Sequence, residues 1–416
     1  MRVALVSEHA NPLAALGGED AGGQNVHVAA LAAGLADDGH EVTVYTRRDD
    51  LSTPARVRTD GYVVEHVPAG PPAEVAKDDL LPYIPELARR LQEAWLLEPP
   101  DLVHTHFWMS GLASLAGVRE LGVPLVQSFH ALGSVKRRQQ GSADTSPPER
   151  IGHERRLCVE ADTVIATCTD EVRELRRLGL PDGRATVIPC GVDTDRFRPG
   201  PGVLADRLRL LVLGRMVPRK GIGNVIEALG RLVHDEGLDV ELVIAGGPAR
   251  RDLDSDPEAM RLREIAAHHR VADRTIFLGS ADRDDVPGLI RSSDAVVSVP
   301  WYEPFGIVPL EAMACGRPVV GTAVGGLLDT VVPGVTGDLV TPRRPDELAR
   351  VLATLLRDPE RRRRYGDAGR RRAVERYDWR HVLAATEDLY ERVTRTARSP
   401  RSRRSNGAID AKEAVR

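Results

Sequence analysis

The chain has 416 residues, which predicts two domains and leaves ample length for two apolar cores. Its net charge of −4 gives no electrostatic support for binding nucleic acid or an anionic membrane. The four cysteines show neither a C-x-x-C pair nor metal-ligand spacing, so we interpret them as buried small residues in a reducing cytosol. The opening apolar run is too short for a signal peptide and no stretch reaches transmembrane length, which favours a cytoplasmic protein without stable membrane insertion.

Short apolar, β-rich runs alternate with helical patterns through the first half of the chain. The predicted strands are Val3–Ser7, Glu41–Thr46, Val63–Val67, Leu102–His106, Leu125–Phe129, Thr163–Thr167 and Thr186–Pro189. The clearest predicted helix is Gln24–Asp37. This alternation is typical of a parallel sheet with helices on both faces. The segment Asp195–Asp206, rich in Pro, Gly and Arg, predicts a linker.

The same alternation then restarts. The predicted strands of the second half are Leu208–Gly214, Val240–Ala245, Thr275–Leu278, Ala295–Val299 and Pro318–Thr322, and its helices are Gly223–His234, Met260–His268, Val308–Cys315 and Asp346–Leu356. Ligands of doubly wound sheets bind outside the carboxyl ends of the strands. The pattern therefore predicts an α/β protein of two doubly wound, Rossmann-like domains, residues 1–195 and 207–377, facing a central cleft.

The end of the chain has a different composition. A basic helical stretch, Arg361–Glu375, is interrupted by Tyr377-Asp-Trp379, and Val382–Val393 predicts a further helix. Residues 397–416 are rich in Arg and Ser and then mixed polar, which predicts a disordered tail. That tail has no aromatic residues, so its arginines alone do not predict a nucleic-acid partner.

Two cations follow the first strand of the second domain. Arg215 comes directly after the strand that ends at Gly214, and Lys220 lies just before the next helix. An arginine fork, a lysine point charge and a helix N-terminus are together suited to bind a diphosphate. Two fixed cations could neutralise such a leaving group without a metal ion.

Two carboxylates follow a later strand of the same domain. Glu303 lies in the loop after Ser298-Val-Pro300, and Glu311 lies in the helix that begins near Gly306. Carboxylates make strong, directional hydrogen bonds to vicinal hydroxyls. One carboxylate could serve a sugar and the other a ribose. Together with the two cations, they indicate a nucleotide sugar as the ligand.

The first domain offers a glycine-rich loop and several histidines. Gly17-Gly18 and Gly22-Gly23 precede the first helix, and glycines let a phosphate approach the backbone closely. The loop is not G-x-G-x-x-G, which counts against a nicotinamide enzyme. The sequences His104-Thr-His106 and Phe129-His130 end two strands that face the predicted cleft, so their histidines are candidates for hydroxyl contacts. No third ligand has suitable spacing, so we predict no metal site and no cofactor.

These motifs resemble those of the family 4 retaining glycosyltransferases of the GT-B fold, over nearly the whole chain up to about Val393. The motifs that carry the resemblance are Gly22-Gly23-Gln24-Asn25, His106-Phe-Trp-Met-Ser-Gly, His130, Gly214-Arg215 with Lys220-Gly221, Ala245-Gly-Gly, and Glu303-Pro-Phe-Gly with Glu311. The resemblance implies that residues 378–396 cross back onto the first domain. It also implies front-face substitution, in which the leaving phosphate oxygen takes the acceptor's proton and the protein supplies positioning and electrostatic stabilisation.

The resemblance also implies roles for single residues. Arg215 and Lys220 would hold the diphosphate of a UDP- or GDP-linked donor, and Glu311 would bind its ribose. Glu303, with the amides of Phe305 and Gly306, would bind the sugar. The remaining donor-side contacts would come from His130 to a sugar hydroxyl and from Gly22 and Gly23 to the phosphate. We take His130, Glu303, Arg215 and Lys220 as the catalytic set.

The acceptor is less well defined, and its predicted contacts are Asn25, Lys77, His106, Phe107, Ala131 and Arg150. The nearest subgroups are the inositol-phosphate N-acetylglucosaminyltransferases of mycothiol synthesis and the sucrose and sucrose-phosphate synthases. In the mycothiol enzymes a Lys, a Tyr, a Thr and an Arg clasp the acceptor phosphate. Lys77 and Arg150 match two of these, but Phe107 and Ala131 stand at the Tyr and Thr positions. Two hydroxyl donors are therefore missing, which favours another small polar acceptor. Gln24 also favours the sucrose-type subgroup.

Two alternatives stay open from the sequence. One is transfer to D-inositol 3-phosphate, as in the mycothiol enzymes. The other, from a different class, is a GT-B epimerase that acts on a nucleotide sugar without an acceptor. The epimerase needs acid and base carboxylates on both sides of the sugar, and we assign none. The oligomeric state is also open, with a homodimer as one option.

Overall fold

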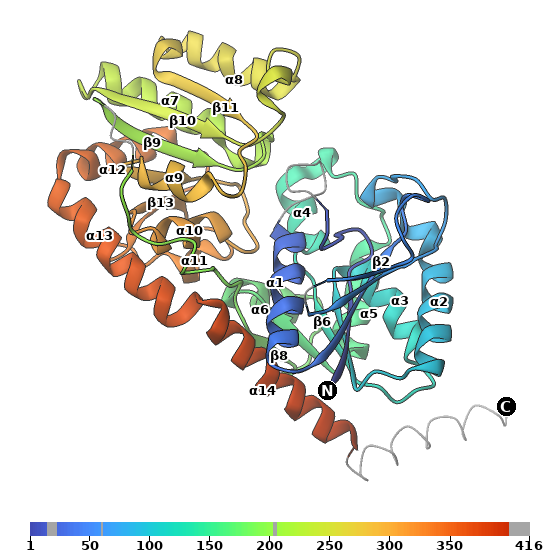
Figure 1. The fold of residues 1–416 in the computed structure, drawn as a ribbon. Coiled ribbons are helices and arrows are strands. Elements are labelled where there is room, and N and C mark those ends of the chain that lie inside the picture. Colours follow the sequence, from blue (N-terminus) through green and yellow to red (C-terminus); the bar gives the residue numbers. More distant parts are fainter. Residues whose placement is uncertain (15–22, 60, 203–205, 399–416) are drawn as a thin grey trace.

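The computed structural model describes residues 1–14, 23–59, 61–202 and 206–398 (Figure 1). Gly22, most of the glycine-rich loop, and the predicted tail from residue 399 onward lie outside these residues. The described part consists of two α/β units, each built on its own sheet, followed by a long C-terminal helical run (Figure 1).

The first unit contains an eight-stranded sheet in the order β3-β4-β2-β1-β5-β6-β7-β8. Its strands are β1 (Arg2–Val6), β2 (Glu41–Arg47), β3 (Arg56–Arg58), β4 (Val63–Val67), β5 (Leu102–His106), β6 (Leu125–Ser128), β7 (Thr163–Ala166) and β8 (Ala185–Val187). All neighbouring pairs are parallel except β3 with β4. The helices that follow the strands are α1 (Gly23–Asp37), α2 (Ile84–Leu97), α3 (Trp108–Gly117), α4 (Gly133–Gln140), α5 (Arg150–Glu160) and α6 (Thr169–Arg177).

The second unit contains a six-stranded parallel sheet in the order β11-β10-β9-β12-β13-β14. Its strands are β9 (Leu208–Leu213), β10 (Val240–Ala245), β11 (Thr275–Gly279), β12 (Ala295–Ser298), β13 (Val319–Thr322) and β14 (Gly337–Val340). Its helices are α7 (Ile222–His234), α8 (Pro257–His268), α9 (Val286–Arg291), α10 (Ile307–Ala314), α11 (Leu327–Thr330), α12 (Pro345–Arg357) and α13 (Pro359–Arg372). Both faces of each sheet bury apolar clusters, as expected of sheets whose strands are mainly parallel.

The chain passes between the two units twice. It leaves the first unit after β8, and it returns through a π-helical turn, Ala373–Tyr377, into α14 (Trp379–Arg398). The two crossings touch, because the Val192 amide donates to the Tyr377 carbonyl at 2.7 Å and Val192 forms an isolated parallel bridge with Asp378. Helix α14 then packs along α1, where Leu383 and Tyr390 join the apolar cluster of Leu31 (Figure 1).

Candidate functional site

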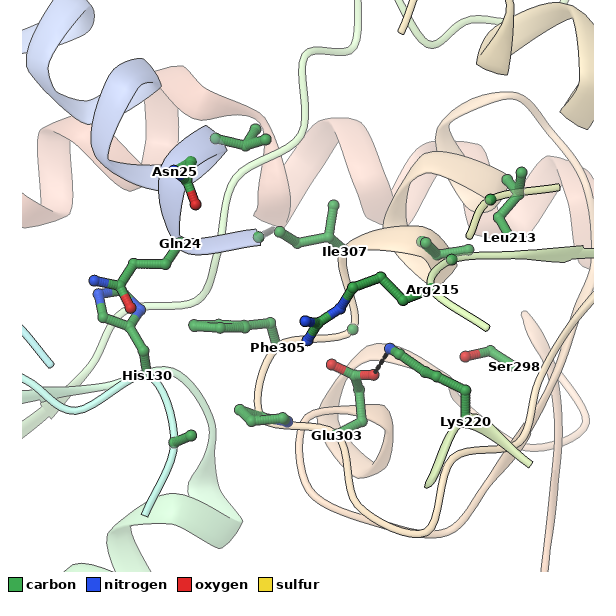
Figure 2. A pocket seen from close by; sticks show the side chains of 18 of the residues that line it. Gln24, Asn25, His130, Leu213, Arg215, Lys220, Ser298, Glu303, Phe305 and Ile307 are labelled. Atoms are coloured by element: carbon green, nitrogen blue, oxygen red, sulfur yellow. Dashed lines mark hydrogen bonds and ion pairs between the residues drawn. The ribbon is translucent and has the colours of Figure 1, made fainter. Parts of the chain in front are cut away.

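A cavity of about 680 Å³ lies between the two units, at the carboxyl ends of their strands (Figure 2). Both units contribute to its lining. Of the predicted site residues that the structure describes, the lining includes Gly23, Asn25, Lys77, Phe107, His130, Ala131, Arg150, Arg215, Lys220, Glu303, Phe305, Gly306 and Glu311. Residues that lie far apart in the sequence, from Gly23 of α1 to Glu311 of α10, therefore meet in one space.

The two predicted cations stand where β9 gives way to α7. Arg215 follows Gly214, and Lys220 precedes Gly221, which caps α7 with a left-handed φ of +71°. A Cβ on Gly221 would lie 2.3 Å from the Val299 carbonyl oxygen, so only glycine fits this turn. The close approach of this turn to the end of β12 brings Lys220 toward the loop that carries Glu303.

Lys220 and Glu303 form an ion pair, with 2.6 Å between Nζ and Oε2 (Figure 2). Burial raises the pKa of Glu303, but the neighbouring Lys220 and Arg219 charges outweigh that effect and hold its pKa below the usual value. Burial lowers the pKa of Lys220, and the Glu303 carboxylate opposes this shift. The predicted phosphate-binding group and the predicted sugar-binding group are thus each other's partners.

Backbone contacts hold the Glu303 loop in place. The Gly326 amide donates to the Glu303 carbonyl at 2.8 Å, and a Cβ on Gly325 would lie 2.2 Å from that oxygen. Gly306 caps α10 with a φ of +76°. The first turns of α10 and α1 meet across the cavity, since a Cβ on Gly23 would lie 3.1 Å from Ile307 Cδ1. Two helix N-termini, which favour anions, therefore converge beside the cations.

The second carboxylate has a partner that the sequence analysis missed. Glu311 Oε1 lies 2.5 Å from Arg283 Nη1, and the Arg283 guanidinium lies over the Phe197 ring at 4.9 Å. Burial raises the pKa of Glu311, and Arg283 opposes the shift. Arg283 also lines the cavity. Its position a few residues after β11, at another strand end, is the signal that could have identified it.

His130 lies at the end of β6 with a left-handed φ of +60°. Its ring faces Phe305 of the other unit, with 5.1 Å between ring centroids (Figure 2). Burial, with the nearby His27 and His104, holds the pKa of His130 well below its usual value, so the ring is neutral. A neutral imidazole can donate or accept one hydrogen bond at the cavity without adding charge there.

His106 lies behind His130 and does not line the cavity. The His106 side chain is fully buried, and its Nδ1 shares a hydrogen bond of 2.8 Å with His130 Nε2. Next to it, His104 bonds Tyr390 of α14 at 2.7 Å and Ser128 at 2.9 Å. The prediction that His106 contacts an acceptor is therefore wrong for its side chain, because the strand end directs this ring into the interior, where it supports His130.

On the side of the cavity that the first unit lines, Phe107 forms the centre of a charged cluster. Its ring lies 5.9 Å from Lys77 Nζ and 5.0 Å from the Arg150 guanidinium carbon. Arg150 is buried, and its hydrogen bonds go to Glu154 at 2.8 Å and to the Ala131 carbonyl at 2.7 Å. The side chain of Arg150 is therefore already engaged within the protein.

Two further polar side chains line this side. Lys136, which the sequence analysis did not single out, pairs with Asp78 and Asp144 at 3.2 Å each. Asn25 donates to the Asn11 carbonyl at 2.9 Å, so at least one of its amide bonds is structural. The carboxylates thus already pair with cations on this side of the cavity.

Within the described ranges, no group of three or more His, Cys, Asp or Glu residues is arranged to hold a metal ion. Over the same ranges, no helix combines the length and the apolar composition needed to span a bilayer.

Comparison with known proteins fits this architecture. Residues 21–196 match the sequence model described as Glycosyltransferase Family 4, and residues 193–372 match that of Glycosyl transferases group 1. A D-inositol 3-phosphate glycosyltransferase of Catenulispora acidiphila is 36% identical over 97% of each chain. Another, from Streptomyces bingchenggensis, is 34% identical over 96% of this chain and 91% of its own.

Solved structures agree. A sucrose-phosphate synthase from Thermosynechococcus elongatus superposes with a TM-score of 0.87, at 30% identity, over 95% of this chain and 99% of its own. HepE of Anabaena, solved with UDP and glucose, shares the fold with a TM-score of 0.72 at 20% identity over 94% of this chain and 99% of its own. The two facing units are those of the GT-B fold. The chain belongs to glycosyltransferase family 4, and it is a retaining glycosyltransferase that uses a nucleotide sugar.

Proposed function

We propose that the protein transfers a hexosyl or N-acetylhexosaminyl unit from a UDP- or GDP-linked donor to a hydroxyl group of a small polar acceptor. One observation carries this proposal. A single cavity is lined on one side by Arg215, Lys220, Glu303 and Glu311, and on the other by His130 and the cluster around Phe107. A donor and an acceptor could therefore occupy the same space, each against its own unit.

The donor half follows from charge. In this proposal the diphosphate takes Lys220 away from Glu303 and binds it together with Arg215 and the N-termini of α1 and α10. Glu303, released from Lys220, is then available to accept hydrogen bonds from sugar hydroxyls. Glu311, oriented by Arg283 at 2.5 Å, accepts from the ribose.

The reaction proposed is front-face substitution. The leaving phosphate oxygen accepts the proton of the attacking hydroxyl, while an oxocarbenium-like centre develops on the same face of the sugar. The cations stabilise the departing charge, and the neutral His130 ring orients the sugar without opposing the positive charge that develops on it. No protein nucleophile is required.

For the acceptor, we favour an unphosphorylated polyol or sugar. Phe107 and Ala131 offer no hydroxyl, while Arg150 pairs with Glu154 and Lys136 pairs with Asp78 and Asp144. A dianionic phosphate would compete with these carboxylates for its cations. Each hydrogen bond to a charged group that it lacks costs about 1.5–3 kcal/mol.

D-inositol 3-phosphate is the second candidate, because relatives that are 34–36% identical over nearly their whole length carry that activity in their names. The test compares inositol with inositol 3-phosphate as acceptors, across a panel of UDP- and GDP-sugars. We expect the unphosphorylated acceptor to have the higher kcat/KM. A preference of a hundredfold or more for the phosphorylated form, about 2.7 kcal/mol, replaces the first candidate with the second.

We also infer a cytoplasmic location, which is supported by four cysteines that are all buried and unpaired, as expected of a reducing compartment.

A further inference from the structure

A glutamate and a histidine that follow β1, Glu8 and His9, form a pair to which no role has been assigned above. His9 lines the cavity, and its Nδ1 lies 2.7 Å from Glu8 Oε1. Behind it, the other carboxylate oxygen of Glu8 accepts a hydrogen bond from the Ser110 hydroxyl, while the Ser110 oxygen accepts from the Glu8 amide at 3.0 Å. Glu8 is only 2% exposed. The carboxylate is therefore fixed from behind by α3 and directed at the histidine ring.

This arrangement sets the tautomer of His9. An ionised carboxylate oxygen only accepts hydrogen bonds, so Nδ1 carries the ring proton in the neutral imidazole. Nε2 is then left with a lone pair. Among the residues that the structure describes, His9 has no other hydrogen-bond partner than Glu8. The ring is 10% exposed and that exposed part faces the cavity, so Nε2 is an acceptor that awaits a donor from a ligand.

The location of His9 points to the acceptor rather than to the donor. Its ring meets the Phe107 ring edge-on, with 4.8 Å between centroids, and so joins the cluster that contains Lys77 and Arg150. His9 and His130 line the same cavity. His9 is therefore placed on the Phe107 side of a cavity that His130 also borders.

We infer that His9, held by Glu8, binds a hydroxyl group of the acceptor through Nε2 and selects a neutral substituent over an anionic one at that point. A hydroxyl donates into the Nε2 lone pair. A phosphate oxygen has no proton to donate, so its lone pair and the lone pair of Nε2 repel each other. The negative charge of Glu8, on the other side of the ring, repels the phosphate further. This inference rests on the proposed function, since it concerns the acceptor subsite of that reaction. It adds His9 as the residue that distinguishes a hydroxyl from a phosphate on the acceptor.

The experiment separates acceptor from donor effects. His9→Gln keeps a polar side chain but loses the aimed lone pair, and we expect the acceptor KM to rise about tenfold, the loss of one hydrogen bond. The donor KM and the slow hydrolysis of the nucleotide sugar without acceptor should stay within about twofold of the unaltered protein, because these report the other half of the cavity.

The second variant, Glu8→Gln, is nearly isosteric and removes the charge. We expect it to raise the kcat/KM of inositol 3-phosphate relative to that of inositol by about fivefold or more, because the repulsion of the phosphate is relieved. A simple loss of packing would lower both values together. The matched control is His40→Gln, which disrupts a second His–Glu pair, His40 with Glu387 at 2.9 Å, neither of which lines the cavity. It should change neither the acceptor KM nor the ratio of the two kcat/KM values.

The inference is overturned if His9→Gln leaves the acceptor KM unchanged. It is equally overturned if His9→Gln raises the donor KM and slows donor hydrolysis by as large a factor as it raises the acceptor KM. It is also overturned if Glu8→Gln leaves the acceptor ratio unaltered while the protein remains folded by circular dichroism. The proposed acceptor class fails separately, if the unaltered protein uses only inositol 3-phosphate. In that case the KM of His9→Gln for inositol 3-phosphate still decides whether His9 binds the acceptor.

Discussion

Lys220 provides a test of the proposed diphosphate site. Its ammonium group pairs with Glu303 at 2.6 Å. We expect Lys220→Ala to lower kcat/KM by about thirty- to a thousandfold, because one charge-assisted contact to the leaving diphosphate is worth about 2–4 kcal/mol in the transition state. Steady-state kinetics on the purified variant measure this. Near-normal kcat/KM would contradict the diphosphate assignment.

The control for that variant is Arg344→Ala, which removes an exposed cation of the same unit that pairs with Asp346. It should leave kcat/KM unchanged. Circular dichroism of both variants should match that of the unaltered protein, since neither side chain belongs to an apolar core.

Phe107 and Ala131 give the residue-scale test of acceptor choice. We expect the double change Phe107→Tyr with Ala131→Thr to raise kcat/KM for inositol 3-phosphate by about three- to thirtyfold, because two hydroxyl donors are restored near a phosphate. The gain is limited because Arg150 stays bound to Glu154 and the Ala131 carbonyl. The measurement compares inositol 3-phosphate with inositol in both proteins. An unchanged ratio would show that these two positions do not contact the acceptor substituent.

Much of the candidate site could be predicted from sequence because strand ends mark it. Arg215, Lys220, Glu303 and His130 each follow a recognisable strand or precede a recognisable helix, and the cavity contains all four. The side chains with which these residues pair could not be predicted. Lys220 and Glu303 are 83 residues apart, and no local pattern reveals that they pair. The sequence analysis also missed the pair of Glu8 and His9. These residues are adjacent in the sequence, and two polar residues after a strand are typical of an ordinary loop.

At the scale of elements, the glycine turn before α7 can be tested against a matched glycine. Gly221 and Gly237 both have left-handed φ values, +71° and +64°, but a Cβ on Gly237 meets nothing within 4 Å. Gly237→Ala should therefore cost only the backbone strain, about 1–2 kcal/mol. Gly221→Ala adds a clash with the Val299 carbonyl and should cost about 3 kcal/mol or more.

Urea unfolding of the two variants measures this difference. Gly221→Ala should also weaken donor binding, because the turn that aims Lys220 must shift, whereas Gly237→Ala should bind normally. Equal unfolding free energies for the two variants would mean that the turn before α7 relaxes at little cost.

The strands were the most predictable elements. Apolar β-rich runs give β1, β2 and β5 to within a residue or two, because strands buried on both faces leave a continuous apolar signal. Helices α2 to α6 were not given ranges from the sequence, since their burial depends on tertiary partners. In α3, Ser110 and Ser114 are fully buried despite being polar. Helix α14 begins three residues before the predicted Val382, because Asp378 bonds Thr194 and Arg380 at its start.

At the scale of the whole molecule, four histidines are buried together in the first unit, and two of them, His27 and His104, contact Trp379 and Tyr390 of α14. Burial lowers the pKa of His27 to about 4 and that of His104 to about 3, and it holds those of His106 and His130 well below their usual value. In the unfolded chain these groups titrate near pH 6.5, so below that value the unfolded state binds more protons than the folded one. The histidine contribution to stability is therefore fully present above about pH 7 and is lost as pH falls toward about 4.

Urea unfolding at pH 7.5 and pH 5 tests this. We expect a clear drop in unfolding free energy at pH 5, and a smaller drop in His27→Gln, because one buried neutral imidazole is removed. His234→Gln, in which the replaced side chain is exposed, is the control and should keep the full drop. For each protein, the unfolding free energy at pH 5 is compared with that of the same protein at pH 7.5. A general loss of stability in a variant therefore does not affect the difference. Equal drops in all three proteins would contradict the pKa assignment.

The predicted independence from metal ions is also tested on the whole molecule. We expect turnover to survive EDTA, because two cations and two helix N-termini already oppose the charge of the leaving group. Activity assays with and without chelator, followed by addition of Mg²⁺ or Mn²⁺, measure this. Loss with EDTA and recovery with metal would mean that the site has been misinterpreted.

The contact between the two crossings has a consequence for the chain's modularity. Because Val192 bridges Asp378, the ends of the intervening segment lie side by side. The second unit is topologically an insertion into the first unit, which is completed only when α14 packs on α1. Such an insertion can be exchanged for the corresponding segment of a relative without moving either anchor point. If each unit binds its own substrate as proposed, exchange of this one segment would combine a new sugar donor with the same acceptor on an unchanged scaffold.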